Sequence, residues 1–149
     1  MALLHGYFRG YDMAHYGNKS RRNLDSCHID LQVLFETVID EWDNSILCGH
    51  RGQEDQDRFF NEGNSKVKWP NGKHNKTPSE AVDAVPYPID WNDRERFIGF
   101  GCYVLGVADT LYNEGKMTHR VRWGGDWQHA DREFTPQSFD DLPHFELVT

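Results

Sequence analysis

The chain has 149 residues and a mass of 17.4 kDa, a size typical of a single globular domain. Its 16 Lys and Arg against 24 Asp and Glu give a net charge of −8, which disfavours nucleic-acid binding because phosphate neutralisation needs clustered basic side chains. Three cysteines without a CxxC pair argue against a disulfide framework and a thiolate zinc knuckle, and no apolar run approaches the roughly 18 residues of a membrane span.

The beginning of the chain predicts an irregular lead-in followed by a long helix. Residues 1–19 are rich in Gly, Tyr and His without a clear period, and they lack the basic and apolar regions of a signal peptide. Apolar side chains recur every three or four positions over residues 20–42, which predicts one amphipathic helix. Ser20 is expected to cap this helix at its N-terminus.

A strand, a helix and a long loop are expected next. Residues 46–48 form a short apolar run that predicts a buried strand. Residues 53–61 predict a polar helix that ends at Gly63. Residues 63–80 are rich in Gly, Asn, Ser, Lys and Pro and therefore predict a long loop, a feature that in compact domains is commonly functional or disordered.

The second half of the chain predicts one helix and three strands. Residues 81–85 read as a strand, and Asp90 or Asn92 opens a helix with an apolar face. Residues 119–123 alternate as a strand, and residues 145–148 close the chain as another. This order of elements predicts an α+β fold with a small sheet and a site on one of its faces.

Three segments combine residue types that suit metal chemistry. His74 and Asp83 flank a proline-containing loop, and Asp83 lies in an otherwise apolar strand, where a carboxylate is costly to bury unless a metal or a base pairs it. His144 begins the last apolar strand. Two histidines and one carboxylate form a ligand set of catalytic zinc sites, with the fourth position left for water. The segments are residues 72–83, 122–127 and 140–147.

Asp141 precedes His144 by three residues and is a candidate general base. Pro143 argues against a helix between them, so a turn is needed to bring Asp141 back toward the metal. A carboxylate in that position can take a proton from the attacking water and return it to the leaving amine. Asp140, next to it, is expected to be a solvated neighbour.

With these residues in place, the chain resembles the zinc metallopeptidases that cleave bacterial cell-wall peptides. These include the D-Ala-D-Ala carboxypeptidases and dipeptidases and, above all, the phage endolysins that are L-alanyl-D-glutamate peptidases. Each motif alone is modest, but four in the family order are specific. The motifs are Lys73-His74-x8-Asp83, Asp141-Leu142-Pro143-His144, Gly49-His50-Arg51 with Gln56, and R-W-G-G-D-W at residues 122–127.

The resemblance implies a Hedgehog/DD-peptidase-like α+β fold, a small antiparallel sheet flanked by helices, with Zn²⁺ in a surface cleft. It implies that His74, Asp83 and His144 bind the zinc and that Asp141 is the general base. Arg51 would hold the scissile carbonyl oxygen and the oxyanion that develops on it, where a fixed guanidinium is favourable.

The resemblance also suggests substrate-binding roles for Gln56, Asp126 and Trp127. Each has a simpler interpretation. Gln56 fits equally well on a solvated helix face, and Asp126 and Trp127 fit a purely structural corner. The sequence departs from many relatives at Gly72, which stands in place of a serine, and in a loop before Asp83 that is two residues longer than in the dipeptidases.

Simpler roles stay open for two of the central residues. Asp83 could be a strand-end carboxylate paired with Arg122, and Arg51 could pair with Glu54 or Asp55 on the surface.

Cysteines and the remaining histidines are expected to play no part in the chemistry. Cys48 and Cys102 lie in apolar runs and are expected to be small core residues. His28 and His119 have no partners at ligand-like spacing and are expected to be surface residues.

The leading functional hypothesis is a single catalytic domain, residues 1–149, acting as a phage endolysin that cuts the L-Ala–D-Glu bond of peptidoglycan stem peptides. One alternative is a D-Ala-D-Ala carboxypeptidase or dipeptidase, and another is a non-catalytic zinc-binding phage structural module. The enzyme is expected to be a monomer that is made in the host cytoplasm and acts in the periplasm or cell wall. Passage to the wall would depend on a partner such as a holin.

Overall fold

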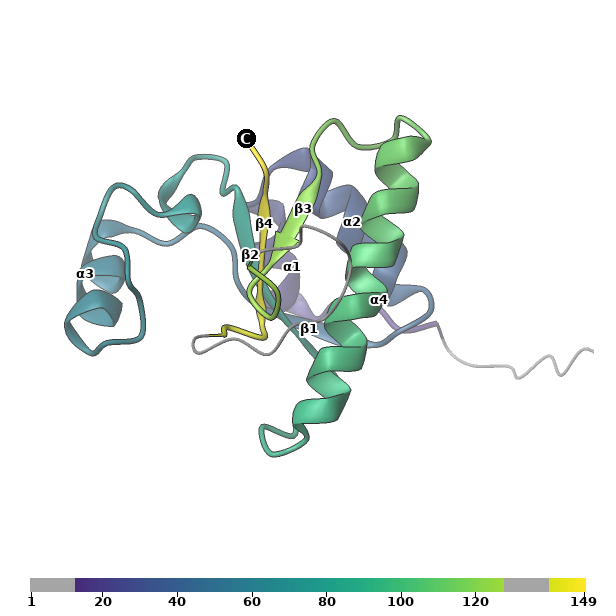
Figure 1. Ribbon diagram of the computed structural model, residues 1–149, viewed down its shortest axis with the longest axis horizontal. Coiled ribbons are helices and arrows are strands. Elements are labelled where there is room, and N and C mark those ends of the chain that lie inside the picture. The colour runs from purple at the N-terminus through teal and green to yellow at the C-terminus, as the bar shows by residue number, and fades with distance from the viewer. Residues whose placement is uncertain (1–12, 128–139) are drawn as a thin grey trace, which may run out of the picture.

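A computed structural model describes residues 13–127 and 140–149, and its centre is one small antiparallel sheet (Figure 1). The strands lie in the order β1-β2-β4-β3, so the last strand of the chain is inserted between two earlier ones. Residues far apart in the sequence therefore become neighbours in the middle of the sheet. The strands are β1 (Asn44–Cys48), β2 (Ala81–Pro86), β3 (Val121–Trp123) and β4 (His144–Leu147).

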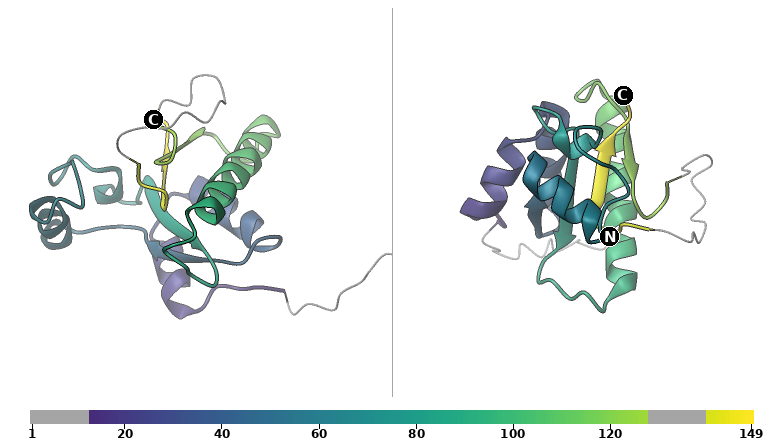
Figure 2. Two further views of the ribbon diagram at one scale, coloured as in Figure 1. Left: turned by 60° about the horizontal axis from the view of Figure 1, so that its bottom comes forward. Right: turned by 90° about the vertical axis from the view of Figure 1, so that its left-hand side faces the viewer.

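Helices lie on both sides of this sheet. The helices α2 and α4 pack against one face, while α3 stands off on the other side (Figures 1 and 2). This layering confirms the predicted α+β architecture. No helix among the described residues is both long and apolar enough to cross a membrane. The helices are α1 (Asn18–Asp25), α2 (Ile29–Ile39), α3 (Gln53–Asn61) and α4 (Arg94–Asn113), with a 3₁₀ turn η1 (Lys73–Asn75).

The prediction of a single helix over residues 20–42 is wrong, because the helix is interrupted between α1 and α2. Cys27 forms an isolated parallel β-bridge with Ser79, and the His28 backbone N–H donates to the Ser79 carbonyl at 2.8 Å. The His28 ring then caps α2 by accepting from the Asp30 N–H. A backbone pairing with a distant segment therefore outweighs an unbroken helical periodicity.

The predicted cap at Ser20 is also wrong. Helix α1 begins two residues earlier, at Asn18, and has Gly17 at its cap position. The Ser20 hydroxyl instead accepts a hydrogen bond from the Ile46 backbone N–H at 3.0 Å, which ties α1 to β1.

Several boundaries shift by a few residues from those predicted. Helix α4 begins at Arg94, capped by the Asp93 carboxylate rather than by Asp90 or Asn92. Gly63 follows α3 with a positive φ of 78°, as expected for the residue after a helix.

Side chains of β2 and β4 alternate between the core and the face opposite α2 and α4. Asp83, His144 and Glu146 point to that opposite face, and Asp83 and His144 are direct partners in the β2–β4 ladder. The ring of Phe145, on the core face, packs edge-on against Phe35. The sheet thus separates a hydrophobic core from a polar site. The residues of β2 and β4 on the core side are Val82, Ala84, Phe145 and Leu147.

Candidate active site

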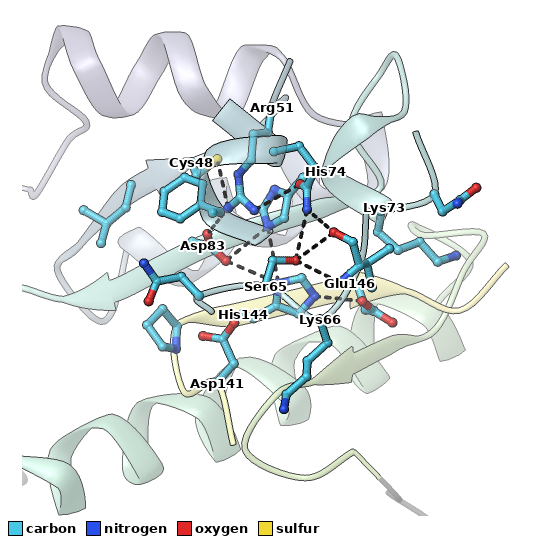
Figure 3. Close-up of a pocket in the computed structure, with 18 of the residues that line it drawn as sticks. Cys48, Arg51, Ser65, Lys66, Lys73, His74, Asp83, Asp141, His144 and Glu146 are labelled. Carbon is cyan, nitrogen blue, oxygen red and sulfur yellow. Dashed lines mark hydrogen bonds and ion pairs between the residues drawn. The ribbon is translucent and has the colours of Figure 1, made fainter. Parts of the chain in front are cut away.

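A cleft of about 800 Å³ lies on the polar face of the sheet, and α3 and the segment after it form one of its walls. Figure 3 shows side chains that line it. The cleft is lined by seven of the candidate residues named from the sequence. Gln56 and Trp127 are two of them. The other five are His74 on η1, Asp83 on β2, His144 on β4, and Asp141 and Arg51 on loops.

His74 is buried on η1 with its proton position fixed by the backbone. Its Nδ1 lies 2.7 Å from the Gly49 carbonyl oxygen, which can only accept a hydrogen bond. In the neutral imidazole the proton therefore sits on Nδ1, and the lone pair of Nε2 faces the cleft.

The neutral ring of His144 carries its proton on the other nitrogen, Nε2. Its Nε2 lies 2.7 Å from a carboxylate oxygen of Glu146, so Nε2 carries the proton in the neutral ring. The lone pair of Nδ1 is thereby presented toward His74 and Asp83. The hydrogen bond to Glu146 sets both the tautomer and the rotation of the ring.

Three electron-pair donors converge between these residues (Figure 3). His74 Nε2 lies 3.2 Å from Asp83 Oδ1, and His144 Nδ1 lies 3.3 Å from the same oxygen. The two ring nitrogens are 3.3 Å apart. When both rings are neutral, their protons lie on the far sides and three lone pairs meet at one point, an arrangement that a cation stabilises. These residues can therefore hold a metal ion.

The pKa shifts of His74 and Asp83 also show that a positive charge is favourable at this point. Burial disfavours a charge on His74, yet the adjacent Asp83 carboxylate outweighs it and raises the pKa of His74 to about 10. Burial likewise opposes ionisation of Asp83, but His74 and His144 hold the pKa of that carboxyl well below its usual range. The buried carboxylate draws positive charge, which a proton on an imidazole or a metal ion can supply.

Asp141 reaches the same site through the predicted turn. The His144 backbone N–H donates to the Asp141 carbonyl at 3.0 Å, which closes a turn over Pro143. A carboxylate oxygen of Asp141 lies within 4.8 Å of the ligand atoms of Asp83 and His144. Burial, and then the charge of Asp83, raise the pKa of Asp141. Its neighbour Asp140 points elsewhere and pairs with Arg94.

The R-W-G-G-D-W segment holds this turn in place. The backbone of Gly124 accepts from the Asp141 N–H at 2.9 Å and donates to the His144 carbonyl at 2.8 Å. A Cβ on Gly124 would lie only 2.2 Å from the Asp141 carbonyl oxygen, so only glycine permits this approach. The Trp123 indole also donates to the Leu142 carbonyl at 2.7 Å. The motif thus holds Asp141 and His144 in position from the side facing away from the cleft.

Arg51 lies beside Asp83 and not on the outer surface. Its guanidinium donates to Asp83 Oδ2 at 3.2 Å and to Gln56 Oε1 at 3.3 Å, and it stacks on the ring of Phe59 with 4.4 Å to the centroid. Asp55 pairs instead with Arg58. Arg51 therefore belongs to the cleft, where its charge faces the carboxylate of Asp83.

Gln56 is only 1% exposed, although it was expected on α3 either at the substrate or in solvent. Its amide donates to the Val67 carbonyl at 2.6 Å, and its carbonyl accepts from Arg51 and from Asn75. The side chain therefore joins α3, the following segment and η1, and its polar atoms are used within the protein.

Trp127 and Asp126 occupy different surroundings. Trp127 lines the cleft, with its ring 5.5 Å from that of His144 and under the guanidinium of Arg122. Asp126 is 7% exposed in the tight turn after β3, and the described residues that line the cleft do not include it.

Sequence reasoning missed Glu146 and gave Arg122 the wrong partner. Arg122 is the cross-strand neighbour of Glu146 and forms an ion pair with it, so the alternative pairing of Asp83 with Arg122 is wrong. The pKa of Glu146 falls to about 2, because hydrogen bonds from His144 and Arg122 outweigh its burial. The signal was present as a His-x-Glu spacing, which places both side chains on one face of a strand.

Gly72, the departure from the family serine, is explained by its neighbour. The Gly72 backbone N–H donates to the Asn75 side-chain oxygen at 2.9 Å, and a Cβ at Gly72 would approach that oxygen to 2.7 Å. The asparagine occupies the space that a longer side chain would need.

The cysteines and histidines assigned to the core or surface also need correction. Cys48 is only half-buried and lies with His74 and Asp83 at the cleft, and Cys102 is exposed on α4. His28 and His119 meet over the buried Asp30, with ring centroids 5.1 Å apart. Their sequence separation of about ninety residues hid this cluster from pattern reasoning.

Comparison with known proteins agrees with this geometry. A family model described as phage L-alanyl-D-glutamate peptidase matches residues 13–148. Among solved structures, Serratia marcescens L-Ala D-Glu endopeptidase ChiX is similar, with a TM-score of 0.68 and 21% identity over 94% of each chain, and this confirms the expected fold. No curated protein sequence is significantly similar to this chain. Because the family model spans nearly the whole chain and its motifs meet in one cleft, the chain belongs to the phage L-alanyl-D-glutamate peptidase family.

Proposed function

We propose that the chain is a zinc endopeptidase that hydrolyses the L-Ala–D-Glu bond of peptidoglycan stem peptides, with His74, Asp83 and His144 as ligands. The supporting observation is the triangle of donor atoms with edges of 3.2 to 3.3 Å. Zinc bonds of about 2.0–2.1 Å in a tetrahedron give ligand separations of about 3.4 Å. The donors therefore fit tetrahedral zinc with little movement, and one position stays open.

Zinc, when bound, supplies Lewis-acid chemistry that polarises the scissile carbonyl and makes water acidic enough to attack at neutral pH. Asp141 takes the proton from the attacking water and passes it to the leaving amine of D-Glu. Its raised pKa suits this double role, because the carboxyl must both accept and release a proton. Arg51 stabilises the negative charge that develops on the carbonyl oxygen.

The residues around these groups act by holding them. Glu146 orients His144 and is itself held by Arg122. Gln56 keeps the Arg51 guanidinium in place. Trp127 forms a wall against which the substrate packs, and Asp126 supports substrate binding through the turn that carries Trp127.

The remaining expectations concern where and how the enzyme works. A monomeric state, synthesis in the host cytoplasm and passage to the wall with a holin stay predictions. Light scattering of the purified protein tests the first of them. Lysis of intact cells, with and without a coexpressed holin, tests the last.

A digest of purified peptidoglycan tests the proposed reaction. Mass spectrometry of the products should show glycan strands that keep L-Ala and released peptides that begin with D-Glu. A chelator should abolish the cleavage, and added Zn²⁺ should restore it. Loss of terminal D-Ala instead would identify a carboxypeptidase, and stoichiometric zinc without any cleavage would identify a binding module.

The variant Asp141→Asn tests the assignment of the base. The amide cannot accept the proton, so kcat should fall by about 10²- to 10⁴-fold while one zinc per chain is retained. Asp55→Asn is the matched control, because that carboxylate pairs with Arg58 on the exposed side of α3 and should leave kcat unchanged. Full activity of Asp141→Asn on purified wall would show that another group is the base.

A further inference from the structure

Among the residues that the structure describes, Trp91 is the most exposed large aromatic side chain that lines the cleft. It lies on the loop between β2 and α4 and is 62% exposed. Its ring stacks on the buried ring of Phe97, with centroids 5.4 Å apart and 26° between the planes. Stacking covers one face of the indole and fixes its orientation, so the other face is presented to solvent. An aromatic surface held in this way is typical of a binding site.

The exposed indole stands between two hollows. One is the catalytic cleft, and the other is a smaller hollow of about 300 Å³. Trp91, Asp141 and Pro143 line both, so the smaller hollow begins at the proposed general base. Arg94 and Asp140 form an ion pair on its wall and offer hydrogen-bond donors and acceptors there. An apolar ring face and polar groups thus lie together beside the reacting groups.

The two walls of the cleft differ in charge. The wall formed by α3 and the segment after it carries Lys66, and Lys73 of η1, which pairs with Glu80, lines the same cleft (Figure 3). Basic side chains there suit the free carboxylates of D-Glu and of the residues that follow it in the stem. The wall at Trp91 belongs to the loop between β2 and α4, a different part of the fold (Figure 1). Its aromatic face suits the part of the substrate before the scissile bond.

The chemistry of the substrate says what that part is. In peptidoglycan the amino group of L-Ala is acylated by the lactyl group of N-acetylmuramic acid. Only one amino-acid residue therefore separates the scissile bond from a sugar. At about 3.5 Å per residue, L-Ala and the lactyl group place the sugar within about 10 Å of the reacting carbonyl. A hollow that shares a wall with the cleft is close enough to receive it.

We propose that the hollow beside Trp91 is a saccharide subsite, in which the N-acetylmuramic acid that carries the cleaved stem packs its pyranose face on the indole. The C–H groups of a pyranose face are apolar and match an aromatic ring, while its hydroxyl and acetamido groups can bond to Arg94 and Asp140. The proposal rests on cleavage between L-Ala and D-Glu, because cleavage farther along the stem peptide would leave the sugar at least one residue more distant from the reacting carbonyl.

Two substrates with the same peptide test the subsite. One is N-acetylmuramyl-L-Ala-γ-D-Glu-diaminopimelate, and the other is N-acetyl-L-Ala-γ-D-Glu-diaminopimelate without the sugar. The wild-type zinc enzyme should show the lower KM for the muramyl substrate. In Trp91→Ala the KM for the muramyl substrate should rise about 5-fold, which corresponds to the loss of one aromatic contact, and kcat should stay the same. The preference for the substrate with the sugar should therefore disappear.

Tyr87 provides the matched control. It is 55% exposed on the same loop, and the described residues that line the two hollows do not include it. Tyr87→Ala should keep the wild-type preference, and Trp91→Phe should keep most of it because the aromatic face remains. Trp91→Phe also provides the comparison if Trp91→Ala does not fold.

The possible outcomes separate this proposal from the proposed function. A wild-type enzyme that cuts both substrates with the same KM keeps the L-Ala–D-Glu activity and overturns the subsite. An equal loss on both substrates in Trp91→Ala also overturns it, because the ring would then serve the peptide. Failure of the wild type to cut either substrate between L-Ala and D-Glu overturns the proposed function and the subsite together.

Discussion

Two clusters of this molecule have the same composition, two histidines and one aspartate, yet they are built for different purposes. In the cleft, His74, His144 and Asp83 turn three lone pairs toward one point. At the N-terminus of α2, His28 and His119 meet over Asp30. The difference lies in where the hydrogen atoms are, which the residue types alone do not say.

The Asp30 cluster is satisfied by hydrogen bonds within the protein. Asp30 Oδ2 accepts from the backbone N–H groups of Thr118 and His119 and from a side-chain donor of each, at 2.8 to 3.1 Å. His28 Nδ1 accepts from the Asp30 N–H. These bonds join α2 to the segment that leads into β3. The cluster is a structural link, because its central oxygen already has four donors.

The cleft has the opposite arrangement. The far nitrogen of each histidine donates outward, to Gly49 for His74 and to Glu146 for His144. Donation outward leaves only acceptors at the centre. A metal site is therefore recognised less by its ligands than by the second set of residues that decides which nitrogen carries the proton.

Removing one ligand gives the largest effect and tests the comparison directly. His144→Ala should weaken zinc binding by at least about 10³-fold and abolish cleavage, because one of three strong ligands is lost. The measurement is zinc content after dialysis, together with peptidoglycan cleavage. His119→Ala is the matched control from the other cluster and should keep one zinc per chain. A second equivalent of zinc in the wild type that disappears in His119→Ala would contradict the structural interpretation of Asp30.

Disturbing the outward hydrogen bond should have a smaller effect. Glu146→Gln should weaken zinc binding by about 10-fold, because an amide orients and polarises His144 less strongly than a carboxylate. Competition with a chromophoric chelator measures the affinity, and the absorption spectrum of the Co²⁺ form reports the ligand geometry. Glu80→Gln, at a carboxylate paired with Lys73, should leave both unchanged. Wild-type affinity and spectrum in Glu146→Gln would show that Glu146 does not position the ligand.

In the structural cluster the expected effect is on stability and not on zinc binding. Burial opposes ionisation of Asp30, but hydrogen bonds from His119 and Thr118 outweigh it, so the pKa of this carboxyl lies below its usual value. A lowered folded-state pKa contributes stability above the unfolded value of about 4 and loses it as the pH falls through the folded value. Asp30→Asn should therefore cost about 2 kcal/mol of unfolding free energy at pH 7.

Urea unfolding at a series of pH values measures this contribution. The difference between wild type and Asp30→Asn should begin to shrink as the pH falls below about 4, where the carboxyl of the unfolded chain takes up a proton, and should be smallest below the lower folded-state pKa of Asp30. Asp40→Asn, at an exposed position after α2, should change the free energy of unfolding by only a few tenths of a kcal/mol at about pH 7. A pH-independent difference for Asp30→Asn would show that the charge of Asp30 is not what stabilises the link.

The sequence predicted the positions of site residues correctly where a short-range pattern places them. Alternation in β2 and β4 places Asp83 and His144 on one face, and Pro143 forces the turn that returns Asp141 to them. Prediction from the sequence failed where a distant partner decides the structure. The backbone pairing of Cys27 with Ser79 interrupts the predicted helix. Arg122 pairs with Glu146 and not with Asp83, the partner that the sequence left open.

The sequence by itself determined the residue types, their order and the local periods. From these the family and the α+β class followed, and the ligand set followed as a prediction. The tertiary structure alone decided which nitrogen of each histidine faces inward, which carboxylate Arg122 neutralises and where Trp91 stands relative to the base. The physical reason is that hydrogen bonds and ion pairs depend on distances of about 3 Å between atoms that the chain brings together from far apart. Residue spacing fixes such distances only within one helix, strand or turn.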